Sequence, residues 1–268
     1  MQEDSTTNKK QKTGINHTNA MWKKDKAPIV PVTILTGFLG SGKTTLLNHI
    51  LRDGSHGMKF AVIENEFGEV GVDEKTLSEN VDEEVIEVMN GCICCTVRGD
   101  LVKALKSLYE RVSQFNGVII ETTGLADPAP VCQTFFVDDD IKARYKLDAV
   151  ITLADSKYIL DRLAEEKPEG AENEAVEQVA FADKILLNKV DLSTEEELER
   201  IEAKLKTLNP TAPIKRCKNA QVSPKELLNI QAFELDRVLD FDPEFLNEEA
   251  EHEHDQTVSS VGLKVEGS

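Results

Sequence analysis

The chain of 268 residues carries 49 acidic and 31 basic residues, a formal net charge of −18 at pH 7, and 40% of its residues are hydrophobic. This length and apolar content allow one large core, or one core and a fragment of a second. An acidic chain repels a phosphate backbone, so the charge argues against a nucleic-acid partner. Three of the five cysteines lie within residues 92–95, too close together for a secreted disulfide framework. We therefore expect reduced thiols and a cytoplasmic protein, with the nucleus as a second compartment.

Residues 1–28 are predicted to form a disordered tail, because they are polar and lack apolar periodicity. Acidic residues at positions 3, 4 and 25 do not suit a signal or transit peptide. The lysines at positions 9, 10 and 12 are interpreted as part of a solvated tail, with a basic nuclear signal as the alternative. No stretch of the sequence approaches the length of a membrane span, so no membrane association is expected.

From Val30 onward, apolar runs alternate with amphipathic segments. This alternation predicts an α/β fold in which a mostly parallel sheet is flanked by helices. Thr194 precedes three glutamates and is the expected N-cap of one helix. Strands are predicted at residues 30–35, 59–64, 117–121, 148–154 and 184–188, and helices at residues 43–52, 100–115, 173–181 and 194–208.

Residues 37–44 read Gly-Phe-Leu-Gly-Ser-Gly-Lys-Thr and match the phosphate-binding pattern G-x-x-x-x-G-K-[ST] between a predicted strand and a predicted helix. The glycines let backbone N–H groups turn inward around phosphates, and the positive end of the helix adds to the attraction. Lys43 would reach the β- and γ-phosphates, and Thr44 would offer its hydroxyl to Mg²⁺. The predicted phosphate-binding residues are Gly37, Gly40, Ser41, Gly42, Lys43, Thr44 and Thr45.

Residues 188–191 read Asn-Lys-Val-Asp and follow a predicted strand in the second half of the sheet. A carboxylate at the last position can accept hydrogen bonds from N1–H and the exocyclic amine of guanine, whereas adenine has neither donor there. The motif therefore favours GTP over ATP, with Asn188, Lys189 and Asp191 as the base-binding residues.

Between these two motifs, the apolar strand at residues 117–121 ends in Glu121 and is followed by Gly124. Glu121 is expected to act on Mg²⁺ directly or through water, and Gly124 is expected to let the backbone follow the γ-phosphate. No glutamine stands out as the residue that positions the attacking water, and Glu66 is the candidate for that role. The predicted catalytic residues are Lys43, Glu121 and Glu66, and slow intrinsic turnover is the expectation.

Cys92, Cys94 and Cys95 bring three thiols into four residues. Thiolates suit tetrahedral Zn²⁺, and three protein ligands leave a fourth position open for an ion that is handed on. Cu(I) is an alternative metal. A cluster of redox-sensing thiols, or plain buried cysteines, are the alternatives without metal. Cys132 and Cys217 are isolated and are expected to be core or surface residues.

The P-loop domain is predicted at residues 29–236. Seven acidic residues and no lysine or arginine lie between positions 242 and 255, which predicts an acidic linker at residues 237–256. The His-Glu-His-Asp run at residues 252–255 is interpreted as solvated filler, with a metal collector as the alternative. Residues 257–268 read as one isolated strand, which we interpret as the first strand of a truncated C-terminal domain.

With residues 37–44, Glu-Asn-Glu-Phe-Gly at 64–68, Gly-Cys-Ile-Cys-Cys at 91–95, and the motifs at 121–124 and 188–191 in order, the chain resembles the CobW family of metallochaperone GTPases. Among these it is most similar to the zinc-regulated GTPase metalloprotein activators. The resemblance covers roughly residues 30–235. It implies that GTP binding and hydrolysis change the grip on Zn²⁺ held by the three cysteines, and that residues 64–68 form a nucleotide-responsive switch.

The resemblance implies a client apo-metalloprotein as partner, and a nucleotide-dependent homodimer is a further expectation. Some eukaryotic members dock methionine aminopeptidase through an N-terminal Cys-Pro motif, whereas residues 1–30 contain no cysteine. A regulatory GTPase switch with a redox-sensing cysteine cluster is the alternative function. A non-catalytic acidic scaffold, in which the P-loop only stabilises the fold, is a third.

Overall fold

The structure is a computed structural model that describes residues 28–64, 97–167 and 173–247. Its described part is an α/β domain built on six parallel strands. The elements in chain order are β1 (Val30–Thr36), α1 (Lys43–Arg52), η1 (Gly54–His56), β2 (Phe60–Glu64), α3 (Val97–Tyr109), η2 (Val112–Gln114), β3 (Gly117–Glu121), α4 (Ala129–Val137), α5 (Asp139–Lys142), β4 (Tyr145–Asp155), α6 (Ile159–Leu163), α7 (Glu174–Ala180), β5 (Lys184–Asn188), η3 (Val190–Leu192), α8 (Glu195–Leu208), β6 (Ile214–Arg216), η4 (Pro224–Glu226) and α9 (Leu235–Phe241).

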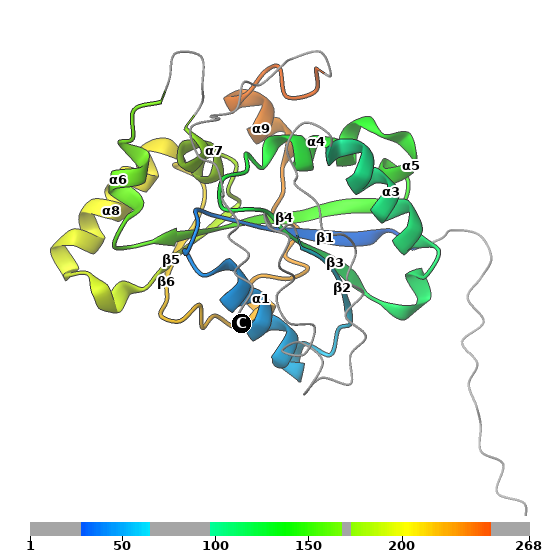
Figure 1. Ribbon diagram of the computed structural model, residues 1–268, viewed down its shortest axis with the longest axis horizontal. Coiled ribbons are helices and arrows are strands. Elements are labelled where there is room, and N and C mark those ends of the chain that lie inside the picture. The colour runs from blue at the N-terminus through cyan, green and yellow to red at the C-terminus, as the bar shows by residue number, and fades with distance from the viewer. Residues whose placement is uncertain (1–27, 65–96, 168–172, 248–268) are drawn as a thin grey trace, which may run out of the picture.

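The sheet has the strand order β2-β3-β1-β4-β5-β6, and all five neighbouring pairs are parallel (Figure 1). In register, Leu35 pairs with Glu121, and Asp155 pairs with Asn188. The carboxyl ends of these strands therefore meet at one edge, which is where open α/β sheets bind their ligands.

Successive side chains of the strands point to opposite faces of the sheet and pack into a hydrophobic core on each face. Val32 and Ile34 pack with residues of α3, α4, α5 and α9, whereas Leu35 packs with α1 and the segment 217–228. On β5, Ile185 and Leu187 pack with α7 and α8. The sheet is thus covered on both faces, and Figure 1 shows α1 on the opposite face from α3 and α4. This burial explains why the strands are almost continuously apolar.

The fold confirms the predicted α/β class, and all five predicted strands and four predicted helices are found. The bounds of α1, β3 and β5 are as predicted, and those of the other elements are shifted. β4 begins at Tyr145 because its first residues pair with the start of β1. The helix predicted at 100–115 ends at Tyr109, and Asn116 instead pairs with Lys59 through two hydrogen bonds of 2.7 and 2.8 Å. β6 escaped prediction because three half-buried residues, Ile-Lys-Arg, carry no periodic signal. The shorter helices α4, α5, α6 and α9 were also missed.

The described fold continues past residue 236, where the linker was predicted to begin. Helix α9 crosses that boundary, and Val238 and Phe245 are buried in the core. Phe245 also packs at 5.8 Å from Phe181, measured between ring centroids. The acidic neighbours of these residues dominate the composition, so two buried apolar side chains were missed. Residues 248–268, with the remainder of the predicted linker and the isolated strand, lie outside the described residues.

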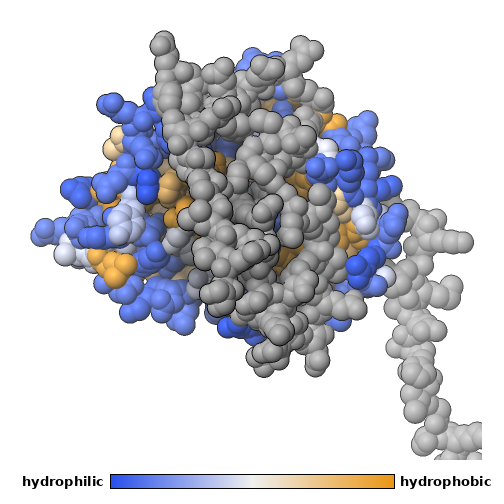
Figure 2. Space-filling model, in the orientation of Figure 1, coloured by the Kyte–Doolittle hydropathy of each residue, from blue (hydrophilic) through white to orange (hydrophobic). Residues whose placement is uncertain are grey.

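Within the described ranges, no helix combines the length and apolar character that crossing a bilayer requires. Figure 2 shows hydrophilic residues over most of the described surface visible in that view, including the region of α8.

The first turn of α8 holds three glutamates behind the N-cap Thr194, whose hydroxyl accepts a hydrogen bond from the Glu197 N–H. The predicted cap is therefore confirmed.

Candidate nucleotide site

The phosphate loop joins β1 to α1 and requires glycine at three positions. Gly37, Gly40 and Gly42 adopt φ angles of +135°, +77° and +111°, which residues with a side chain rarely adopt. A Cβ on Gly37 would lie 2.3 Å from the Leu153 carbonyl, and one on Gly42 would lie 2.5 Å from the Asn188 side chain. The loop therefore leaves its concave side to backbone N–H groups, as an anion cradle needs.

Lys43 is folded back over this loop. Its Nζ donates to the carbonyls of Gly37 at 2.7 Å and Phe38 at 3.3 Å, and the side chain is buried. Burial lowers the pKa of Lys43, and the nearby Glu121 carboxylate partly opposes that shift. A desolvated ammonium group beside a row of N–H donors is a strong attractor for a polyphosphate.

Thr44 and Glu121 meet across the space between α1 and β3. The Thr44 hydroxyl donates to Glu121 Oε1 at 2.7 Å, so a hydroxyl and a carboxylate lie side by side at the edge of the phosphate loop. These are the hard oxygen ligands that Mg²⁺ prefers, and the pair fits that ion. Glu64 is in register with Glu121 on the neighbouring strand, which places both acids on the same face of the sheet.

Ser41 supplies a further sign that the loop is built for a ligand. Its Oγ is fully buried and has no hydrogen-bond partner within the part of the chain that the structure describes. A buried hydroxyl without a partner costs about 1–3 kcal/mol, a cost that a bound phosphate oxygen would remove. Thr45, the last predicted phosphate-binding residue, is exposed one position after Thr44 on α1.

Asn188 connects the phosphate loop to the opposite side of the site. Its amide donates to the Ser41 carbonyl at 2.9 Å, and its Oδ1 accepts from the Ala220 N–H at 3.0 Å and from Cys217 Sγ at 3.5 Å. The side chain is almost fully buried. Asn188 is therefore placed as a structural bridge between three segments at this edge of the sheet.

Lys189 and Asp191 follow the buried Asn188 at the end of β5. Lys189 adopts a left-handed conformation with φ of 60°, and its Nζ pairs with Asp155 Oδ2 at 2.7 Å. Asp191 lies in η3, and its carboxylate is 3.3 Å from Lys218 Nζ. The Asp191 side chain remains 38% exposed, which leaves it accessible to an incoming base.

The segment that follows β6 completes this region, and sequence reasoning missed it. Asn219 and Ala220 both adopt positive φ angles of 52° and 53°, a strained conformation that tertiary contacts must maintain. Ala220 is held by Asn188, and Lys218 by Asp191. The signal was weak, because the residues that precede it form the short strand β6.

The loop after β3 lies against the tip of the phosphate loop. A Cβ on Gly124 would come within 2.4 Å of the Leu39 backbone N, so only glycine allows this approach. The Thr122 N–H donates to the Leu35 carbonyl at 3.0 Å, and the Thr122 hydroxyl to Thr36 Oγ1 at 3.0 Å. Gly124 therefore lies beside the phosphate loop, and its role at the γ-phosphate stays a prediction.

Glu66 and the three clustered cysteines, Cys92, Cys94 and Cys95, lie outside the described residues. Their predicted roles stay predictions. The two cysteines that are described, Cys132 and Cys217, are buried free thiols, and burial raises the pKa of each. Across the described ranges, no group of three or more His, Cys, Asp or Glu side chains forms a metal site.

A phosphate loop between the first strand and its helix, an acid at the end of the adjacent strand and a parallel sheet in this order define a P-loop NTPase. The family model described as "CobW/HypB/UreG, nucleotide-binding domain" matches residues 31–216. The chain belongs to this family.

Curated relatives agree with this assignment. The zinc chaperone YjiA of Escherichia coli is 40% identical over 211 residues, covering 77% of this chain and 63% of that protein. The zinc-regulated GTPase metalloprotein activator 1 of Schizosaccharomyces pombe is 39% identical over 210 residues, covering 76% of this chain and 50% of that protein. The chain thus spans between half and two thirds of the length of these two relatives.

A solved structure is also similar. The crystal structure of Zn(II)-bound YjiA GTPase from E. coli aligns with a TM-score of 0.58 and 34% identity, covering 77% of this chain and 63% of that chain. The similarity supports the fold and the family at the level of the whole nucleotide-binding domain.

Proposed function

We propose that the protein is a GTP-hydrolysing metallochaperone whose cargo is Zn²⁺ and whose partner is a client apo-metalloprotein. The observation that carries the nucleotide part is the contact between Thr44 and Glu121 beside the buried Lys43 and the glycine cradle. The names of the relatives, a zinc chaperone and a zinc-regulated GTPase activator, support the metal part.

Lys43 would exchange its two loop carbonyls for the β- and γ-phosphates, since these charged acceptors bind an ammonium group more strongly. Thr44 and Glu121 would hold Mg²⁺, which neutralises charge on the phosphates when it is bound. Gly124 would present the backbone of its loop to the γ-phosphate, since it already touches the phosphate-loop tip.

Asp191 would accept two hydrogen bonds from guanine, for which its carboxylate is suitably exposed. Lys218 lies beside it and would hold its orientation. The bridge through Asn188 keeps the base side and the phosphate side at a fixed separation. GTP is therefore the proposed nucleotide.

Cys92, Cys94 and Cys95 would bind the transported ion as thiolates. Their segment follows Glu64, which is in register with Glu121 at the carboxyl edge of the sheet, so the chain enters this segment from the side of the proposed Mg²⁺ site. Loss of the γ-phosphate would change the shape of that segment and loosen the metal. Glu66 lies on the same stretch and is the proposed water-positioning residue.

GTP hydrolysis by the purified chain tests the enzymatic part. We expect slow single-turnover hydrolysis, abolished in Lys43→Ala. Turnover on the order of 10 s⁻¹, the range of an Arg-finger-stimulated GTPase, would contradict slow intrinsic chemistry. Hydrolysis that is unaffected by Lys43→Ala would favour a non-catalytic scaffold.

Zinc affinity tests the transport part. It would be measured by competition with a chromophoric chelator, with GDP or a non-hydrolysable GTP analogue bound, for wild type and a Cys92, Cys94 and Cys95 to Ser triple variant. We expect tight binding that the variant loses, with about a tenfold difference between nucleotides, or ~1.4 kcal/mol of coupling. Weak binding without nucleotide dependence, together with reversible thiol oxidation, would favour a redox-sensing switch.

A further inference from the structure

Gln178 reaches from α7 to the loop that follows β3. Its side chain is 1% exposed, and Nε2 donates to the carbonyls of Gly124 at 3.2 Å and Ala126 at 3.1 Å. A primary amide nitrogen carries two hydrogens, so both bonds form at once. One side chain therefore holds two main-chain carbonyls of a loop more than fifty residues away in sequence.

Holding these carbonyls sets the direction of the loop backbone. In a trans peptide the C=O and the following N–H point in opposite directions. The Gly124 carbonyl faces Gln178, so the N–H of Leu125 points away from α7. The loop is also pressed against the phosphate-loop tip, because Gly124 leaves no room for a Cβ beside Leu39. Gln178 and the phosphate-loop tip therefore both contact the loop at Gly124.

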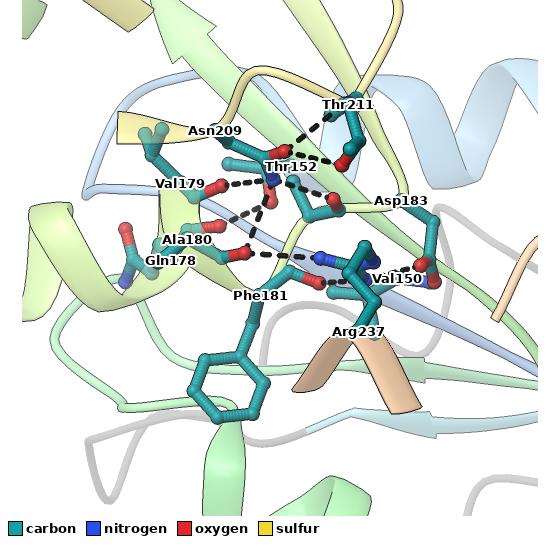
Figure 3. A network of polar contacts seen from close by, with 12 residues as sticks. Val150, Thr152, Gln178, Val179, Ala180, Phe181, Asp183, Asn209, Thr211 and Arg237 are labelled. Carbon is teal, nitrogen blue, oxygen red and sulfur yellow. Dashed lines mark hydrogen bonds and ion pairs between the residues drawn. The ribbon is translucent and has the colours of Figure 1, made fainter. Parts of the chain in front are cut away.

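The bracing helix is itself firmly mounted, as Figure 3 shows. Thr152 Oγ1 of β4 donates to the Gln178 carbonyl at 2.6 Å. The two hydrogens of Asn209 Nδ2 are shared among the carbonyls of residues 179, 180 and 182, and Arg237 donates to those of residues 180 and 181. The carbonyls of residues 178–182, in the last turn of α7 and just after it, therefore all lie within hydrogen-bond distance of side-chain donors, where a helix leaves its own carbonyls without intrahelical partners. Because the backbone around Gln178 is held in this way, the position of its side chain relative to the loop is fixed.

We propose that Gln178 is a positioning residue for the GTPase reaction, which holds the Gly124 loop in the shape that meets the third phosphate of the nucleotide. This inference rests on the proposed GTPase function. Gln178 does not itself touch the phosphates. Its loss releases the loop from α7, and the nucleotide must then order the loop on binding, a cost that falls on the triphosphate state because the γ-phosphate is what the loop meets.

The experiment compares Gln178→Met, which keeps the length and removes both donors, with Gln178→Glu, which sets a carboxylate against two carbonyls. Gln133→Met is the matched control. Gln133 on α4 also donates to two main-chain carbonyls, those of Phe245 at 2.7 Å and Asn247 at 3.3 Å, but these lie in the C-terminal segment beyond α9. Thr152→Val is a milder variant that weakens only the mount of Gln178.

For each full-length variant we would measure denaturation, the affinities for GDP and for a non-hydrolysable GTP analogue, and single-turnover hydrolysis. We expect both Gln178 variants to slow hydrolysis at least tenfold and to weaken the analogue about tenfold, with GDP affinity within twofold of wild type. Thr152→Val should change the same two quantities in the same direction by less, and Gln133→Met should change neither.

Equal losses of GDP and analogue affinity, or hydrolysis within twofold of the Gln133→Met control, would overturn the positioning role. Failure of the proposed function looks different. Wild type would then hydrolyse no GTP, while the analogue-to-GDP affinity ratio of the Gln178 variants would still test whether the loop is held for a third phosphate.

Discussion

At the scale of single residues, the nucleotide site depends on glycines, at positions where a side chain would clash with a neighbouring segment. Gly37, Gly42 and Gly124 each lie where a Cβ would come within 2.5 Å of a neighbouring atom. The first two also need positive φ angles, whereas Gly124 is required only by space. This difference makes Gly124 the cleaner position for testing what the close approach does.

Gly124→Ala is expected to push the loop away from Leu39, since its Cβ would lie 2.4 Å from a backbone nitrogen. Overpacking of this kind costs about 1–3 kcal/mol. We expect the affinity for a GTP analogue to fall by more than the affinity for GDP, measured by fluorescence titration alongside urea denaturation.

The control for that variant is Gly99→Ala in α3, where a Cβ meets nothing within 4 Å. Alanine in a helix is more favourable than glycine by roughly 0.5–1 kcal/mol, so this variant should be slightly stabilised with unchanged nucleotide binding. Unchanged nucleotide affinities in Gly124→Ala would show that the close approach has no part in binding.

At the scale of elements, α9 is joined to the sheet and to α7 by one arginine. Arg237 pairs with Asp183, whose carboxylate also accepts from the Val150 N–H at 2.7 Å. Burial raises the pKa of Asp183 to about 6, although Arg237 and the Val150 N–H each oppose that shift. The ion pair is fully formed only when the carboxylate is charged.

The pKa of Asp183 has a direct consequence for stability. An aspartate in an unfolded chain has a pKa near 3.9, so between about pH 4 and pH 6 the folded protein binds the proton more tightly. The contribution of this group to stability is therefore greatest below about pH 4 and is lost as the pH rises through about 6.

Arg237→Met would leave Asp183 buried beside Val150 without its cation. We expect a loss of about 3–5 kcal/mol at pH 7.5, and a smaller loss at pH 5, because the carboxyl group can then take up a proton. Urea denaturation at the two pH values measures this. Arg111→Met, which removes an exposed arginine bonded to Gln114, should change stability by less than about 0.5 kcal/mol at either pH. A loss in Arg237→Met that does not depend on pH would contradict the coupling to Asp183.

At the scale of the whole molecule, the nucleotide site is the place where both halves of the sheet meet. β1 and β3 supply the phosphate side, β5 and the segment after β6 supply the base side, and Asn188 connects them. A ligand that spans both sides binds only the folded chain. The free energy of unfolding of the whole domain should therefore increase with ligand concentration.

GDP with Mg²⁺ at one hundred times its dissociation constant is expected to stabilise the fold by ~2.7 kcal/mol, seen as a higher midpoint in thermal denaturation. ADP with Mg²⁺ at the same concentration should give a much smaller shift, since Asp191 finds no donors on adenine. Equal shifts with GDP and ADP would refute the proposed guanine preference.

Much of this protein follows from its sequence alone. Three short patterns can be recognised without a structure, because each depends only on residues a few positions away. They are the phosphate loop, the acid at the end of β3 and the cap of α8. The buried parallel strands can also be recognised from the sequence, because burial on both faces makes each strand a continuous apolar run.

Only the tertiary structure decided the contacts that join distant segments. Asn188 meets a loop carbonyl 147 residues away, and Gln178 meets the Gly124 loop. Phe245 enters the core from an acidic stretch. Such partners are selected by the three-dimensional packing of the sheet and its helices. A single buried polar or apolar side chain leaves no periodic trace in the sequence, which is why these contacts were found only in the folded molecule.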